Sequence, residues 1–275
     1  MKKTFKLNII TPINTFSFDE VEYLRAPSIE GLFGVMKGHI PSIIALDVGE
    51  IKIIKDNKMK VSEAVESRRS TRAFLDKAVE NSTIERLLEK SSRSASGGNL
   101  QPWKVSVINN EIMGKFLDFQ KNWSEPETPE YDIYPKGLKE PYRTSRFNVG
   151  MEMYSLLGIG RDDHEARTQQ MLENFVFFGA PAAFFCFIDK QMGRPQWSDL
   201  GMFLQTFMLL AEEEGLSTCA QEAWSMKPQS VKEFCQIDED LILFCGMSIG
   251  HKDVDAKINQ LKTDRRPLKE WVDFI

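Results

Sequence analysis

Three arginines close together are the first residues in this chain whose spacing suggests chemistry. Arg68, Arg69 and Arg72 fall within five residues, and the hydroxyl of Ser70 stands between them. Guanidinium groups are planar, forked donors that match phosphate oxygens, so three of them can converge on one dianionic phosphate. A lone arginine cluster is more often a solvated helix end. A second feature is therefore needed before this one indicates a site.

A run of small and polar residues at 94–103 supplies that feature. Its glycines, beginning with Gly97, let the backbone approach a flat ligand, and Ser96, Asn99 and Gln101 offer polar groups around it. Alone, such a run is more often a plain turn. Together, and separated by one helix, the two runs predict a phosphate-bearing planar cofactor, flavin mononucleotide (FMN), and hence redox chemistry.

Composition limits the class of protein. The chain has 275 residues, of which 42% are hydrophobic, and a net charge of −5, which favours one or two globular domains and gives no general attraction for nucleic acid. We expect no metal, no membrane span and no secretion signal. The four cysteines form no CxxC pair. A cytoplasmic location is therefore expected.

The elements that must position these residues follow from the hydrophobic pattern. Ser82–Glu85 fits a capping box that opens the helix between the two runs, with Ile84 and Leu87 on its buried face. A long helix is expected at about 197–214, with Gly215 as its stop. Strands are expected at 104–108, 182–188, 217–220 and 241–249. The aromatic runs at 175–178 and 184–185 are interpreted as core.

The first 55 residues have a different pattern. Apolar and polar residues alternate at 5–9, 21–24 and 51–53, which predicts strands, and turn residues separate these runs at 11–14, at Gly31 and Gly34, and at 38–41. The pattern becomes helical after Met59. We therefore expect two domains, 1–58 and 59–275.

From Met59 onward the chain resembles the FMN-dependent nitroreductase family, in particular its nitrobenzoate and nitrobenzene reductases. The resemblance depends on seven short motifs, at 68–72, 96–103, 140–143, 178–181, 199–202, 221–224 and 265–267. It implies an α+β, nitroreductase-like fold, with an antiparallel-rich mixed sheet flanked by helices. It also implies a homodimer with FMN at the subunit interface.

The resemblance assigns roles to particular residues. Those that would hold the phosphate and ribityl chain are Arg68, Arg69, Ser70 and Arg72, and Lys262 and Arg265 would close over the phosphate. Those that would approach the ring from the partner subunit are Ser96, Gly97 and Asn99, and Gln101 is a further cofactor-binding candidate. The Glu222–Ala223 peptide would donate to flavin N5, and no side chain is needed as a nucleophile.

The implied activity is hydride transfer from NAD(P)H through flavin N5 to a nitroaromatic or similar electron-poor substrate by a ping-pong cycle. No Gly-x-Gly-x-x-Gly run is present, so the nicotinamide would dock over the flavin transiently. The same fold also supports dehalogenation and dehydrogenation, which remain alternatives.

The first 55 residues resemble the N-terminal β module of the ATP synthase epsilon subunit, through motifs at 8–12, 26–35, 38–41 and 46–50. The family module is longer, so this part is expected to be a short, incomplete all-β module. Three arrangements stay open: poor order, packing on the reductase, or pairing with a second copy. An alternative function follows, in which this module contacts ATP synthase.

One irregular segment has two interpretations. Residues 125–142 are rich in proline and carry Tyr131, Tyr134 and Tyr142. They could form a lid over an aromatic substrate or a plain surface excursion.

Overall fold

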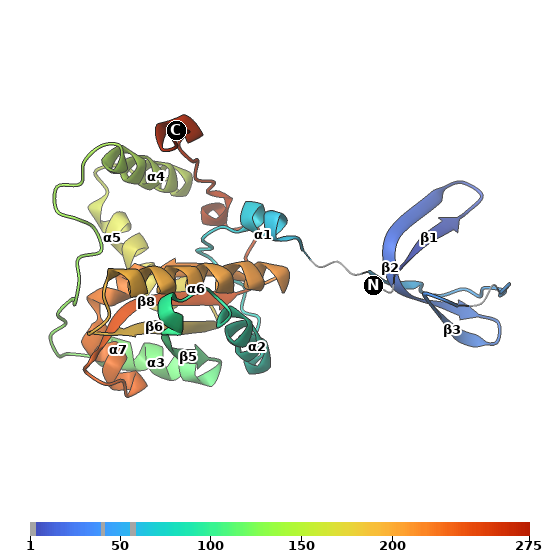
Figure 1. Cartoon of the computed structure of the whole chain (residues 1–275), viewed down its shortest axis with the longest axis horizontal. Coiled ribbons are helices and arrows are strands. Elements are labelled where there is room, and N and C mark those ends of the chain that lie inside the picture. Colours follow the sequence, from blue (N-terminus) through green and yellow to red (C-terminus); the bar gives the residue numbers. More distant parts are fainter. Residues whose placement is uncertain (1–3, 40–41, 56–58) are drawn as a thin grey trace. The chain divides into compact units, whose positions relative to one another are not determined.

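The computed structural model describes residues 4–39, 42–55 and 59–275 of the chain. The chain divides into two compact units, Met1–Met59 and Lys60–Ile275 (Figure 1). Each unit has its own sheet.

The first unit is one antiparallel sheet built around a long strand. Its strands are β1 (Phe5–Ile10), β2 (Thr15–Ser28), β3 (Gly31–Met36) and β4 (Lys52–Lys55), and the three predicted alternation runs fall within or overlap β1, β2 and β4. β1, β3 and β4 all pair with β2. The prediction of a turn at Gly34 is wrong, because Gly34 lies inside β3 opposite Arg25. A Cβ there would lie 2.6 Å from the Tyr23 hydroxyl, so this glycine makes room for a ring.

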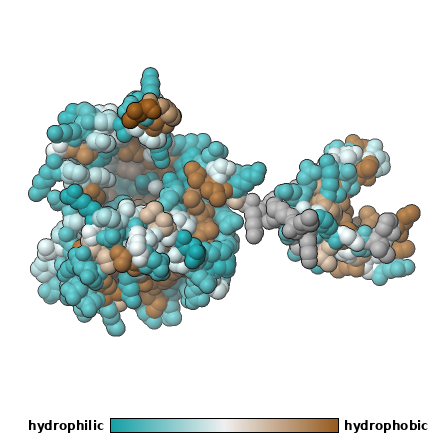
Figure 2. Space-filling model, viewed as in Figure 1, coloured by the Kyte–Doolittle hydropathy of each residue, from teal (hydrophilic) through white to brown (hydrophobic). Residues whose placement is uncertain are grey.

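This sheet leaves much of its apolar surface uncovered (Figure 2). Among its described residues, the buried hydrophobic side chains are Val21 and Ala26. Exposed large hydrophobic residues include Ile10, Ile13, Phe16, Ile29, Leu32, Met36, Ile43, Leu46 and Val48. The unit therefore has the single-layer character expected of an incomplete module.

The second unit is a four-stranded antiparallel sheet flanked by helices. Its strands are β5 (Lys104–Asn109), β6 (Ala182–Asp189), β7 (Ser217–Gln221) and β8 (Leu241–Gly250). Its α-helices are α1 (Val61–Ser67), α2 (Asn81–Ser91), α3 (Glu111–Asn122), α4 (Tyr142–Leu157), α5 (His164–Leu172), α6 (Arg194–Glu213) and α7 (Pro228–Cys235). Short 3₁₀ turns are η1 (Gly97–Asn99), η2 (Glu173–Gly179), η3 (Glu222–Met226), η4 (Lys257–Gln260) and η5 (Leu268–Glu270). The α+β prediction is confirmed.

The strands run in the order β5-β6-β8-β7, and the central strand β6 is buried on both faces. Its alternate residues enter two separate cores: Phe184 packs with α2 and α6, whereas Phe185 packs with α3 and α7. Both aromatic runs contribute to the core, as predicted: Phe177 and Phe178 of the first run and Phe184 and Phe185 of the second are buried. The strands at β5, β6, β7 and β8 confirm the four predicted ranges to within one residue.

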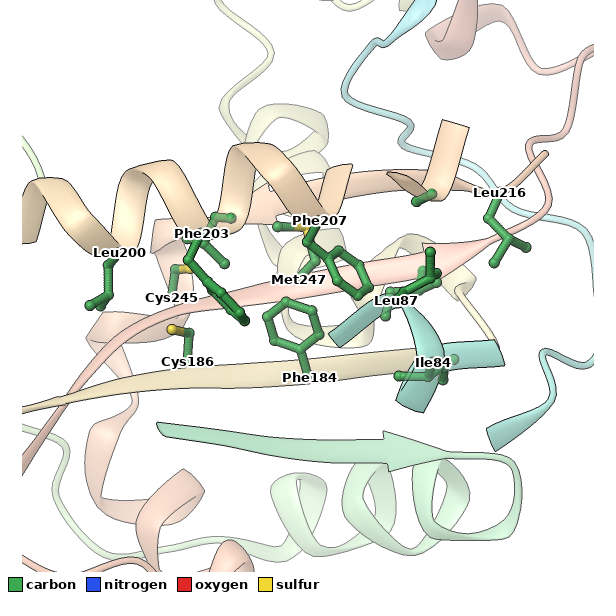
Figure 3. Packing of buried hydrophobic residues seen from close by; sticks show 14 of the residues in the cluster. Ile84, Leu87, Phe184, Cys186, Leu200, Phe203, Phe207, Leu216, Cys245 and Met247 are labelled. Atoms are coloured by element: carbon green, nitrogen blue, oxygen red, sulfur yellow. The ribbon is translucent and has the colours of Figure 1, made fainter. Parts of the chain in front are cut away.

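The first core is shown in Figure 3, where side chains of α6 lie above those of β6. Phe207 meets Phe184 edge to face, with 4.9 Å between ring centroids, and Leu200 and Phe203 complete the buried stripe. Ile84 and Leu87 enter the same core from α2, as the pattern predicted.

Two helix starts differ from the prediction. α2 begins at Asn81 after Glu80, so the capping box at Ser82 is wrong: Ser82 lies inside the first turn. α6 begins at Arg194 rather than near Trp197, because the Gln196 side chain accepts a hydrogen bond from the Gly193 amide at 3.1 Å and fixes an earlier first turn.

No helix in the part of the chain that the structure describes is sufficiently long and apolar to cross a membrane.

Candidate functional site

The predicted arginine run follows α1 and lies against the sheet edge formed by β7. Ser70 forms a parallel bridge with Thr218, and the Thr71 amide donates to the Thr218 carbonyl at 3.0 Å. The Arg72 amide donates to the Asn259 side chain at 2.8 Å. These contacts fix the backbone of the run at residues 70–72 and leave its arginine side chains available to bind a ligand.

Those side chains line a cavity of 530 Å³, here called the arginine pocket. Its lining residues are Val65, Arg68, Arg69, Ser70, Arg72, Gln205, Leu261, Thr263 and Arg265. Five residues that the sequence predicted for the phosphate therefore lie together. Lys262 is exposed and is not among the lining residues.

The arginine pocket is strongly cationic. Within the described residues, none of its four guanidinium groups forms an ion pair with a carboxylate. Arg69 donates to the Glu66 carbonyl at 2.6 Å, and Arg265 donates to the Thr263 hydroxyl at 2.9 Å. Burial, and then the nearby charge of Arg265, lower the pKa of Arg68. The charge of Glu212 acts on the pKa of Arg68 in the opposite direction, but four guanidinium groups without an ion-paired carboxylate among the described residues favour a bound anion.

The predicted small-residue run forms η1 and the turn after it. Gly97, Asn99 and Gln101 are exposed, and Asn99 and Gln101 have left-handed backbones with φ of 58° and 50°. Asp199, buried on α6, accepts hydrogen bonds from the Ser96 hydroxyl at 3.0 Å and the Gly97 amide at 3.1 Å. The turn is therefore held in place while its polar groups face outward.

This turn does not line the arginine pocket of its own chain. The pocket receives Gln205 from α6, and the turn is bound by Asp199 six residues earlier on the same helix. α6 thus positions both predicted parts of the site without bringing them together in one chain.

The predicted Glu222–Ala223 peptide begins η3, directly after β7. The first amides of a helix have no acceptor within the helix, so they can donate elsewhere. Gln221 fixes this junction: its amide group donates to the Asn174 carbonyl at 2.8 Å, and its oxygen accepts from Ser248 at 2.5 Å. Glu222 and Ala223 do not line the arginine pocket.

Strand β7 nevertheless lies near both the arginine pocket and the start of η3. Burial raises the pKa of the Cys219 thiol to about 11, and the charges of Arg72, Glu222 and Arg68 also act on it. The arginines and the start of η3 therefore lie within electrostatic range of one thiol on β7.

Trp224, within η3, anchors the turn in the second core. It is fully buried, and its ring centroid lies 4.7 Å from that of Phe177 and 5.1 Å from that of Phe185. A Cβ on Gly246 would lie 2.3 Å from the Trp224 ring, so only glycine fits opposite it on β8.

The irregular segment 125–142 divides into two parts. Its first part is fixed to the body: Glu130 accepts from the buried Lys232 at 2.6 Å and from the Leu243 amide at 3.0 Å, and Tyr131 donates to the Phe244 carbonyl. Its second part, from Tyr134 onward, lines a larger cavity of 1110 Å³ below α4, here called the α4 cavity. Arg72 and Leu261 line both this cavity and the arginine pocket.

Sequence reasoning missed the contributions of Asp199 and Gln205. Both lie on α6, where a polar residue is ordinarily solvent-facing. The motif at 199–202 drew attention to Asp199, but its hydrogen bonds to Ser96 and Gly97 span about a hundred residues of chain. The acidic residue inside an otherwise apolar helical stripe was the available signal.

Comparisons with known proteins match both parts of the chain. Residues 65–251 match the Nitroreductase family, and residues 4–67 match the ATP synthase Delta/Epsilon chain beta-sandwich domain. For the second match, the ATP synthase epsilon chain of Chlorobium limicola is 41% identical over 64 residues, which cover 23% of this chain and 73% of that one.

Relatives of the larger part are similar along nearly their whole length. The 4-nitrobenzoate reductase of Pseudomonas putida is 32% identical over 77% of this chain and 93% of its own. The nitrobenzene nitroreductase of Ectopseudomonas oleovorans is 29% identical, over 78% and 96%. The crystal structure of the FMN and NADPH-dependent nitroreductase NfnB from Sphigopyxis sp. strain HMH superimposes with a TM-score of 0.75 at 42% identity, over 79% and 99%. On this evidence the chain belongs to the nitroreductase family.

Proposed function

We propose that the chain is an FMN-dependent oxidoreductase that uses NAD(P)H to reduce nitroaromatic or similar electron-poor compounds. The single observation that carries this proposal is the arginine pocket, a cationic cavity with no ion-paired carboxylate among its described surroundings. The relatives described above bear names of the same chemistry.

The pocket residues fit a flavin phosphate and its ribityl chain. Guanidinium groups bind phosphate through paired hydrogen bonds, and an anion beside Arg68 would counter the effects of burial and of the Arg265 charge, which lower its pKa. Ser70, Gln205 and Thr263 add neutral hydrogen-bonding groups suited to ribityl hydroxyls. The cavity volume of 530 Å³ accommodates such a group.

We assign the phosphate to Arg68, Arg69, Arg72 and Arg265. We also assign a closing role to Lys262, an exposed residue between two lining residues of the pocket. Cations in these places neutralise the phosphate and fix the orientation of the ligand.

The amides of Glu222 and Ala223 are assigned as donors toward the reactive edge of the ring. They suit this role because η3 leaves its first amides without intrahelical acceptors and Gln221 holds the junction rigid. When FMN is bound, it supplies the two-electron chemistry in which NAD(P)H is oxidised and a nitro group takes hydride and a proton, loses water and becomes nitroso.

We propose that Ser96, Gly97, Asn99 and Gln101 complete the site from a second copy, which makes the enzyme a homodimer. The turn is exposed and firmly held by Asp199, as a donated surface must be. A cytoplasmic location accompanies this proposal, because the four cysteines are free thiols.

Purification provides the direct test. The protein is expected to be yellow or to gain flavin absorbance on addition of FMN, and then to oxidise NAD(P)H with a nitroarene as acceptor. A colourless preparation that neither binds FMN nor oxidises either nicotinamide would overturn the proposal.

A second function is proposed for residues 1–58, namely contact with ATP synthase. The epsilon-type match and the exposed apolar side chains of this unit support it. Co-purification of the full chain with rotor subunits, and its loss when residues 1–58 are deleted, would establish the contact. If the deletion leaves all associations unchanged, the proposal fails.

A further inference from the structure

We propose that the α4 cavity selects anionic aromatic acceptors, such as carboxylated nitroarenes, over neutral ones, and that Arg146 is the residue that makes the selection. This inference rests on the proposed function. The related reductases are named for both a charged and a neutral nitroarene, so similarity alone does not decide between them.

The first argument is the position of the cavity. It lies below α4, where the surface is hollowed (Figure 2), and it shares Arg72 and Leu261 with the arginine pocket. A ligand in it would therefore lie next to the group held by the arginines. A volume of 1110 Å³ leaves room for an aromatic substrate there.

The second argument is the arrangement of the α4 residues that line the cavity. Arg143, Arg146, Gly150 and Met153 follow the spacing of one helix face. Charge is thus concentrated toward the start of the helix, and apolar surface toward its end. This arrangement is complementary to a ring that carries an anionic group at one end.

The third argument is the difference between two arginines on that face. The Arg143 Nε lies 2.7 Å from Glu140 Oε1, so its charge is already balanced. The Arg146 guanidinium instead lies over the Tyr134 ring, 4.0 Å from its centroid, and no ion pair to it is found in the described structure. Stacking on a ring fixes the plane of the guanidinium and keeps its edge donors and charge available for a carboxylate.

Arg167, on α5, repeats this arrangement in the lining of the same cavity. Its guanidinium lies 4.2 Å from the centroid of Tyr154, and its Nε donates to the Gly160 carbonyl at 3.0 Å. Two stacked cations without acidic partners therefore face one cavity, whose lining contains one carboxylate, Glu140, already paired.

Gly150 supplies a fourth observation. Glycine in the middle of a helix lowers helix stability, yet a Cβ at this position would meet nothing within 4 Å in this chain. Packing within the chain therefore does not require it, whereas a ligand in the cavity benefits from the space.

The test compares 4-nitrobenzoate with its neutral isostere 4-nitrobenzamide, in the full-length protein with FMN. We expect the wild type to favour the benzoate about tenfold or more in kcat/KM, as a charge-assisted hydrogen bond provides. Arg146→Gln should remove most of this preference and leave the benzamide value within about twofold. Arg266→Gln is the matched control, because it removes a guanidinium that lies over a tyrosine, Tyr142, but does not line the cavity, and it should leave the preference intact.

Binding is measured separately by calorimetry with benzoate and benzamide, which are not reduced. Benzoate should bind more tightly to the wild type and equally with benzamide to Arg146→Gln. Circular dichroism checks folding of each variant, and Arg167→Gln provides a second variant if Arg146→Gln is unfolded.

Several results would overturn the inference. One is that the wild type reduces the charged and neutral nitro compounds with equal kcat/KM and binds benzoate and benzamide with equal affinity. Another is that Arg146→Gln lowers kcat/KM equally for both nitro compounds. A rise in KM for NADPH but not NADH in Arg146→Gln, with the acceptor preference unchanged, would assign the cation to a cofactor phosphate instead. If neither nitro compound is reduced, the proposed function fails, whereas calorimetry still decides the charge preference.

Discussion

The buried carboxylate of Asp199 lies 3.0 Å from the hydroxyl of Ser96, and the same oxygen accepts the Gly97 amide. One side chain of α6 thereby holds the exposed turn that we assign to a partner's flavin. The stability of this turn therefore depends on one acidic residue.

Replacing this acid tests its role. Asp199→Asn keeps the size of the side chain and removes its charge, so two charge-assisted hydrogen bonds weaken. We expect FMN affinity to fall by about tenfold, measured by quenching of flavin fluorescence. Asp118→Asn, an exposed change on α3, is the control and should bind FMN normally. Unchanged affinity in Asp199→Asn would show that the turn does not contribute to the flavin site.

Arg265→Gln should weaken FMN binding without lowering the stability of the FMN-free protein. Loss of a phosphate partner should weaken FMN binding by about 10- to 100-fold. The Tm of the FMN-free protein should not fall, because a like charge beside Arg68 is removed. Arg266→Gln is the neighbouring control, since Arg266 does not line the arginine pocket. Equal affinity in the two variants would contradict the phosphate assignment.

Gly246→Ala should destabilise the second unit. The new Cβ would lie 2.3 Å from the Trp224 ring, and overpacking of this kind costs about 1–3 kcal/mol. Urea unfolding measures the loss. Gly201→Ala on α6 is the matched control, because a Cβ there meets nothing within 4 Å and a helix gains from alanine. The contact is unimportant if both variants unfold at the same urea concentration.

The cysteines should be unreactive in the native protein. Burial raises the pKa of Cys186 to about 12 and that of Cys235 to about 12, and it raises the pKa of Cys245 as well. A raised pKa keeps each thiol protonated at pH 8, and the thiol is a poor nucleophile. Mass spectrometry after iodoacetamide treatment should find no labelling until the protein is unfolded. Rapid native labelling of Cys186 would contradict its burial.

The ion pair between Arg86 and Glu214 should make stability depend on pH. The Arg86 hydrogen bond, 2.9 Å long, lowers the pKa of Glu214 below its ordinary 4.5. A lowered folded-state pKa stabilises the protein above that ordinary value, and this contribution is lost as pH falls through the folded pKa.

Arg86→Gln should therefore lower stability at pH 7 by about 0.5 kcal/mol, the usual size for a surface pair. The difference from wild type should vanish well below pH 4.5. Thermal unfolding across this range measures it, with Lys115→Gln, which affects an exposed pair on α3, as the control. A difference that persists in acid would exclude Glu214 as the cause.

The sequence predicted those features that depend on local pattern. The aromatic run in β6 predicted that Phe184 and Phe185 lie in the core, and the helical spacing of apolar residues with a stop at Gly215 identified α6. The start of α2 was predicted wrongly. Ser82 fits a capping pattern, but the helical backbone already begins at Asn81. Local pattern cannot distinguish two helix starts that are only two residues apart.

In the candidate site, too, the residues that are adjacent in sequence were predicted, and those brought together by tertiary packing were not. The arginine run was visible because its members adjoin in sequence, and it does line one pocket. The roles of Gln205 and Asp199 were missed because their partners are distant in sequence and are brought close only by the packing of α6 on the sheet. A single sequence can mark Asp199 as an acid within an apolar helical stripe, but it does not show which distant residue that acid contacts.

α4 has no buried residue along its sixteen positions. A helix of this length is marginal when it stands without tertiary support, so its amide hydrogens should exchange with deuterium sooner than those of α6, whose stripe is enclosed. Arrival of a ligand beneath it would then register as slowed exchange along this one segment. Deuterium exchange in α4, the helix that we propose distinguishes acceptors, would therefore also report whether the α4 cavity is occupied.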